Sequence, residues 1–185
     1  MYWCKLNNYR VALIATLTFT FCLSACQPDL KETGSDMKYF DLKAYFKAKV
    51  SKLSTQNRPV LKTVTHNGVT ETKTISINNW ERELNMFSES DINKPAWKDS
   101  YSVQNTAGGS LIYIAKDPEL QTREIIINKD KDKVKSILIF NHTKNILYET
   151  NEKLTYVPDS VYRIEKSQHV KLMGSNQYDI KGIFN

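Results

Sequence analysis

The side chain best placed to do chemistry in this sequence is the thiol of Cys26. It follows the small residues Ser24 and Ala25, at the end of an apolar run over 11–23. The first ten residues contain two basic side chains and no acid. A basic start, a short apolar run and a small-residue cleavage box are the three parts of a signal peptide. We therefore expect cleavage before Cys26, so that the mature chain begins at this residue.

Two other interpretations of this segment stay open. One is an ordinary secretory signal that has a cysteine near its cut, and the other is a transmembrane anchor. The apolar run of 13 residues is short for an anchor, since a spanning helix takes about 20 apolar residues. We expect residues 1–25 to be a removed signal peptide, residues 26–37 a polar, flexible tether, and residues 38–185 a single domain.

The run Leu23-Ser24-Ala25-Cys26 resembles the lipobox of bacterial lipoproteins. The resemblance implies a diacylglyceryl thioether on Cys26, and usually an acyl chain such as palmitate on its new amino group. Several acyl chains hold a protein on a membrane stably, with about 0.8 kcal/mol from each buried methylene. Gln27, rather than Asp, follows the cysteine, which by analogy with diderm lipoproteins favours the outer membrane. The domain would then face the periplasm or the cell surface.

Composition limits the partners of the mature chain. The 160 residues left after position 25 suffice for one domain that buries about two-thirds of its unfolded surface. Loss of two basic residues lowers the formal net charge by two, from +6 to +4. Cys4 and Cys22 leave with the signal, so no internal disulfide is expected. We expect contact with the membrane through the lipid anchor, an envelope protein or polymer as partner, and no nucleic acid.

Catalytic and metal-binding motifs are missing from the sequence. The histidines fit no metal-ligand spacing such as HExxH: His66, His142 and His169. There is no G-x-S-x-G nucleophile elbow, and Gly108-Gly109 lacks the lysine of a phosphate loop. We therefore expect no metal, no cofactor and no enzymatic activity. A hydrolase acting on envelope material is the least favoured alternative, because polar groups from distant strands would have to converge.

Helical spacing marks two segments near the start of the mature chain. Apolar side chains recur at steps of three and four residues from Tyr39 to Leu53, which predicts a helix starting at Asp36 or Asp41. This basic, aromatic-rich helix could lie on a bilayer, but such a stripe more often packs on a sheet. Asn78 begins a capping-box-like pattern that predicts a second helix over about 79–90.

Strand signals dominate the rest. Asn67-Gly68 between the runs 60–66 and 69–77 is a strong hairpin signal, which pairs His66 with Val69. Further strand-length runs follow, with turns expected within 141–144 and 174–176: 101–105, 110–116, 122–128, 133–141, 144–150, 153–157, 160–167, 169–173 and 177–184. The class is α+β, with N-terminal helices packed on a curved, mostly antiparallel sheet. A half-barrel around an apolar cavity is an open alternative.

Two strand-length runs, 124–127 and 136–140, are continuously apolar. Such runs predict central strands that are covered on both faces. The helix-plus-sheet pattern resembles envelope lipoprotein carriers and their outer-membrane receptors, whose half-barrels hold acyl chains. This is a likeness of architecture alone, and no residue motif accompanies it.

A second resemblance covers most of the mature chain. The stretches 79–84 (NWEREL), 90–101 (SDINKPAWKDSY) and 156–160 (YVPDS) resemble small uncharacterised lipoproteins of Bacteroidota-type bacteria. The resemblance implies a diderm envelope and a single β-rich domain. It implies no particular activity and no catalytic residue.

Two main hypotheses on function follow from these patterns. The first is a membrane-anchored, non-enzymatic binding or accessory module of the envelope. The alternative is a carrier of an apolar small molecule or lipid. Its cavity would lie between the sheet and the apolar side chains of the predicted helices: Phe46, Leu53, Trp80, Leu84 and Phe87.

Overall fold

A computed structural model describes residues 37–106 and 108–184, and these belong to one compact unit. The signal peptide, Cys26 and the tether up to residue 36 lie outside the described residues. None of the helices in the described part of the chain is long and apolar enough to cross a membrane.

The helices precede most of the sheet. The first is α2 (Leu42–Gln56), and Asp41 caps it by accepting a hydrogen bond from the backbone N–H of Ala44 at 2.7 Å. The single helix predicted over 79–90 is wrong, because the chain forms two short helices, α3 (Trp80–Glu83) and α4 (Asn85–Glu89). The cap of α3 is Asn79 rather than Asn78, since the Asn79 side chain accepts from the N–H of Arg82, and α4 has no side-chain cap.

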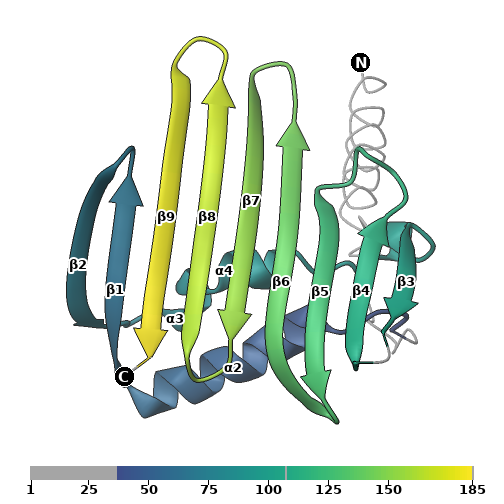
Figure 1. Cartoon of the computed structure of the whole chain (residues 1–185), viewed down its shortest axis with the longest axis horizontal. Coiled ribbons are helices and arrows are strands. Elements are labelled where there is room, and N and C mark those ends of the chain that lie inside the picture. Colours follow the sequence, from purple (N-terminus) through teal and green to yellow (C-terminus); the bar gives the residue numbers. More distant parts are fainter. Residues whose placement is uncertain (1–36, 107, 185) are drawn as a thin grey trace, which may run out of the picture. The chain divides into compact units, whose positions relative to one another are not determined.

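The described strands form one antiparallel sheet in the order β2-β1-β9-β8-β7-β6-β5-β4-β3, which confirms the α+β class (Figure 1). The sheet is open, with β2 and β3 as its edges. A turn of 3-10 helix, η1 (Pro95–Trp97), leads into β3. The strands are β1 (Pro59–His66), β2 (Val69–Ser76), β3 (Tyr101–Asn105), β4 (Ser110–Ala115), β5 (Thr122–Asp130), β6 (Lys133–Lys144), β7 (Tyr148–Val157), β8 (Val161–Val170) and β9 (Gly174–Phe184).

The first hairpin has the predicted register. His66 pairs with Val69, and the turn residues Asn67 and Gly68 both have positive φ, 49° and 86°. The strands at the centre of the sheet are longer than predicted. The turns expected within 141–144 and 174–176 are wrong, because those residues extend β6 and β9. Polar residues there pair with long neighbouring strands, so the backbone stays extended where composition alone suggests a turn.

The helices cover one face of the sheet, which settles the location of the α2 apolar stripe. The ring centroids of Phe46 in α2 and Tyr156 in β7 lie 5.1 Å apart, and those of Trp80 in α3 and Tyr162 in β8 lie 6.1 Å apart. The side chains expected to surround a ligand are all buried in this core, packed among the sheet and one another: Phe46, Leu53, Trp80, Leu84 and Phe87. The contact between helices and sheet is therefore filled by protein side chains.

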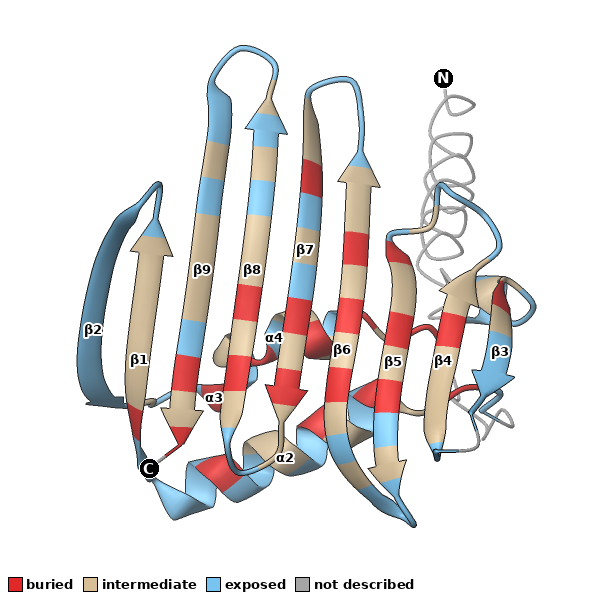
Figure 2. Cartoon of the chain, viewed as in Figure 1, coloured by how far each residue is buried: buried red, intermediate tan, exposed pale blue. Residues whose placement is uncertain are grey.

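The prediction that apolar strands are covered on both faces is wrong for the described residues. Ile125 and Ile139 face the helices and are buried, whereas Ile126 and Leu138 on the opposite face are only half-buried. Figure 2 shows most buried residues of β7 and β8 in the half of each strand that lies nearer the helices. Cross-strand apolar neighbours, rather than a second layer, shield the other face.

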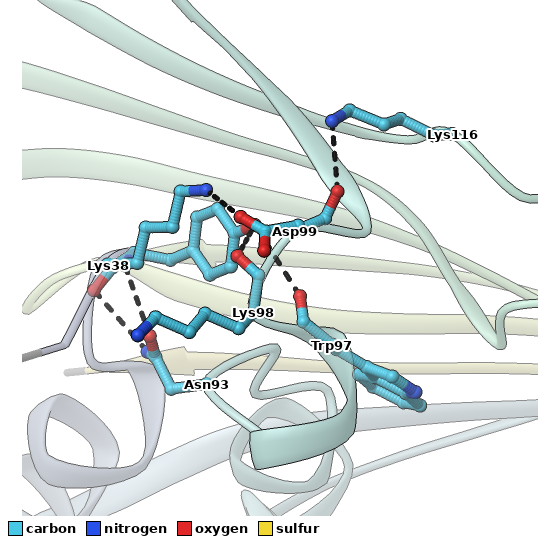
Figure 3. A network of polar contacts seen from close by, with 7 residues as sticks. Lys38, Asn93, Trp97, Lys98, Asp99 and Lys116 are labelled. Atoms are coloured by element: carbon cyan, nitrogen blue, oxygen red, sulfur yellow. Dashed lines mark hydrogen bonds and ion pairs between the residues drawn. The ribbon is translucent and has the colours of Figure 1, made fainter. Parts of the chain in front are cut away.

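Polar contacts hold the start of the described chain against the segment before β3 (Figure 3). The hydroxyl of Tyr39 donates to the carbonyl of Lys98 at 2.7 Å, and the Asn93 side chain accepts from the Tyr39 N–H at 3.1 Å. Lys38 forms an ion pair with Asp99 at 2.6 Å. The first described residues thus lie beside the β3 edge of the sheet.

Candidate functional site

The side of the sheet away from the helices, called here the helix-free face, carries a groove. Tyr156 and Tyr162 point toward the helices, so their strand neighbours Thr155 and Arg163 point the other way. The groove has a volume of about 620 Å³ and crosses β1, β9, β8, β7 and β6. We call it the cross-strand groove.

The strand register places two rows of side chains along the cross-strand groove. The first row, in order across the strands, is Phe140, Lys153, Glu165, Asp179 and Thr65. The second row, one step nearer the β6–β7 and β8–β9 turns, is His142, Asn151, Ser167 and Gln177. The groove therefore presents an aromatic ring at one end and polar or charged groups along its length.

Charged groups of the first row form ion pairs with one another or with Arg163. Arg163, just beside the groove, binds Asp179 through two bonds, Nε to Oδ1 at 2.9 Å and Nη2 to Oδ2 at 2.6 Å. The Oε1 atom of Glu165 lies 3.4 Å from Nη2 of Arg163, and its Oε2 atom lies 3.7 Å from Nζ of Lys153. The hydrogen bonds from Arg163 hold the pKa of the Asp179 carboxyl below its ordinary value. Asp179 is therefore ionised and compensated at neutral pH.

A bulge in β5 sets one end of the groove. The pairing of β5 with β6 shifts between Thr122 and Glu124, so Arg123 occupies the extra position. Bulges redirect a side chain out of the regular alternation. Arg123 lines both the cross-strand groove and a smaller hollow of about 140 Å³ beside it, and donates to the carbonyl of Asp117 at 3.4 Å.

The histidines are not brought together into one site. His142 lies in the groove, with Nδ1 2.8 Å from the Asn151 side-chain oxygen. His66 is exposed and stacks on Tyr178, with ring centroids 4.3 Å apart, and His169 contacts Ser175 near a turn. Among residues 37–106 and 108–184, no group of three or more His, Cys, Asp or Glu side chains is arranged to hold a metal ion.

This geometry suits reversible binding. Ionised groups that already satisfy one another can exchange hydrogen bonds with a polar partner, and the aliphatic stems of Lys and Arg and the ring of Phe140 add apolar contact. The groove could not be predicted from the sequence, because its residues come a few at a time from separate strands. The apolar run 136–140 held the only signal, since its outward residues Leu138 and Phe140 lie on this face.

No protein-family model matches the sequence, and neither a curated protein sequence nor a solved structure matches the chain.

Proposed function

We propose that this chain is a lipid-anchored, non-enzymatic binding module of the bacterial envelope, located at the outer membrane. The observation that supports this best is the cross-strand groove of about 620 Å³, on a face that no described element covers. This volume lies within the range of ligand sites in proteins. The partner would be an envelope protein or polymer.

The dimensions of the groove favour an extended partner. Five neighbouring strands spaced by about 4.8 Å give the groove a length of about 19 Å. Paired charges make it close to neutral, and amide and hydroxyl groups of Asn151, Ser167 and Gln177 offer hydrogen bonds along the second row. An extended polymer chain or a protein segment rich in polar groups would lie across the strands.

Lipid attachment at Cys26 would keep this face near the membrane. A flexible tether of about 11 residues has an r.m.s. reach of about 20 Å. We expect the full-length chain to incorporate labelled fatty acid in a diderm host and Cys26→Ser to lose the label. Labelling that persists in Cys26→Ser would contradict anchoring at this residue.

Occupation of the groove is tested by cysteine footprinting in intact envelopes. Ser167→Cys lies in the groove, and Lys47→Cys lies on the exposed side of α2. We expect a maleimide to label both variants in purified full-length protein, but to label Ser167→Cys much more slowly in envelopes. Equal labelling of Ser167→Cys in both preparations would count against a partner in the groove. The unsubstituted chain gives the background from its own cysteines.

A carrier of an apolar molecule is the second candidate. One observation favours it: Ile112, Ile126 and Leu138 form a half-buried apolar row on the helix-free face, beside Phe140. A lipid lying on this row would add its mass to the protein. Native mass spectrometry of the full-length chain from its host should then show an excess mass that denaturation removes, and a bare chain would argue against the carrier.

A further inference from the structure

The outer edge of β2 is open and regular. All eight residues of β2 are exposed, and the strand pairs with β1 without a bulge. Among the described residues no strand pairs with its other edge. The opposite edge of the sheet, β3, has only five residues and begins at the buried Tyr101. An open edge of this kind is a template for pairing with another strand.

The hairpin geometry shows which backbone groups face outward. His66 and Val69 flank a two-residue turn, so they exchange both of their hydrogen bonds with each other. Hydrogen-bonded and non-bonded pairs then alternate along the hairpin. The N–H and C=O groups of Thr70, Thr72 and Thr74 therefore point away from β1, toward the open edge.

The sequence of β2 is self-complementary in the antiparallel direction. When Thr72 is placed opposite Thr72 of a second copy, Thr70 faces Thr74, Glu71 faces Lys73 and Val69 faces Ile75. In this register, each threonine whose backbone N–H and C=O groups point outward lies opposite such a threonine of the second copy. These backbone groups can therefore hydrogen-bond across the boundary. We propose that two copies of this chain pair through their β2 edges in this register, forming one continuous sheet.

Charge selects this register over its neighbours. Another register that keeps the same backbone groups hydrogen-bonded and each side chain on the same face of the sheet must be shifted by two residues. One such shift places Glu71 opposite Glu71, and the other places Lys73 opposite Lys73. Like charges directly opposite each other are destabilising, whereas opposite charges and threonine pairs stabilise a sheet.

The threonines of the hairpin already form such pairs within one chain. The hydroxyls of Thr63 and Thr72 lie 3.0 Å apart, and those of Thr65 and Thr70 lie 2.8 Å apart. Pairing of two copies would continue this row across the boundary. Contact between two strands is small beside the roughly 1,200 Å² or more buried in stable complexes, so the dimer is reversible and is best detected by trapping.

Disulfide trapping tests the register in the full-length chain. In a hydrogen-bonded pair the Cα atoms lie about 5.5 Å apart, within the range of about 4.4–6.8 Å that a disulfide bridges. Oxidation in membranes should convert Thr72→Cys into a covalent dimer. Thr74→Cys alone should form none, since its own copies would be about 14 Å apart. A mixture of Thr70→Cys and Thr74→Cys chains should cross-link.

Charge variants test the selection, with Thr72→Cys as the reporter. Glu71→Lys alone, or Lys73→Glu alone, should lower the dimer yield by about tenfold, and the double exchange should restore it. The unsubstituted chain gives the background of Cys4, Cys22 and Cys26. Absence of cross-links from both Thr72→Cys and the Thr70–Thr74 mixture, or a yield unaffected by single charge reversal, would overturn the proposal. These results do not depend on the proposed groove partner.

Discussion

At the residue scale, Gly182 makes room for the aromatic ring that joins the sheet to α3. A Cβ atom at this buried position would overlap the ring of Tyr162 on the neighbouring strand. The Tyr162 hydroxyl donates to Glu83 at 2.6 Å, and Glu83 also pairs with Lys62 at 2.6 Å. A single missing side chain in β9 thus allows a contact between β8, α3 and β1.

Gly182→Ala should destabilise the protein by about 1–3 kcal/mol, because the added methyl group forces the Tyr162 ring from its place. Urea unfolding followed by circular dichroism measures this free energy. Gly108→Ala is the matched control, since its Cβ would meet no atom nearer than 3.9 Å, and it should change stability by less than about 0.5 kcal/mol. Equal stability of the two variants would contradict this account of Gly182.

The Arg163–Asp179 pair gives stability a defined pH dependence. Because the pKa of Asp179 is lower in the folded state than its ordinary 3.8, the ionised form stabilises the fold above about pH 4. This contribution is lost as the pH falls through the folded-state pKa. The unfolding free energy of Asp179→Asn should therefore lie below that of the unsubstituted chain at pH 7 and pH 5 by the same amount. The difference in unfolding free energy between the two proteins should shrink toward pH 2. A difference that stays constant down to pH 2 would contradict this role of the Asp179 carboxylate.

At the element scale, the sequence predicted those features that depend on residues close together in the chain, such as a hairpin turn and a helix start. Asn67-Gly68 predicted both the β1–β2 turn and its register, and Asp41 was one of two expected starts of α2. The lengths of β7 and β8 could not be predicted, since polar residues such as Asn151 and Gln168 interrupt the apolar alternation. Pairing with neighbouring strands keeps them extended, and that pairing joins residues distant in sequence.

The side-chain N-cap of α2 should contribute about 1 kcal/mol to the free energy of unfolding. Asp41→Ala removes the oxygen that accepts from Ala44 N–H, so the free energy of unfolding should fall by that amount in a urea titration. Asp41→Asn keeps an acceptor oxygen and should stay within a few tenths of a kcal/mol of the unsubstituted chain. A similar loss in both variants would show that the cap bond is not the source of the stability.

At the scale of the whole molecule, the two faces of the sheet have different roles. Apolar side chains such as Phe46 and Tyr156 fill the contact between helices and sheet, while paired charges and polar groups line the groove on the other face. Residue types alone could not predict the groove. Phe140 and Thr65 lie at its two ends, 75 positions apart in sequence, and only the strand order brings them into one row on the same face.

Site-specific photo-cross-linking in the native host tests most directly whether the helix-free face binds an envelope partner, as we propose. A photoreactive residue replaces Ser167 in the groove, or Lys47 on α2 as control. We predict a reproducible product from position 167 and little from position 47: a discrete band for a protein partner, or a smear sensitive to polymer-degrading enzymes. Absence of a product at 167, or equal yields at both positions, would contradict the claim.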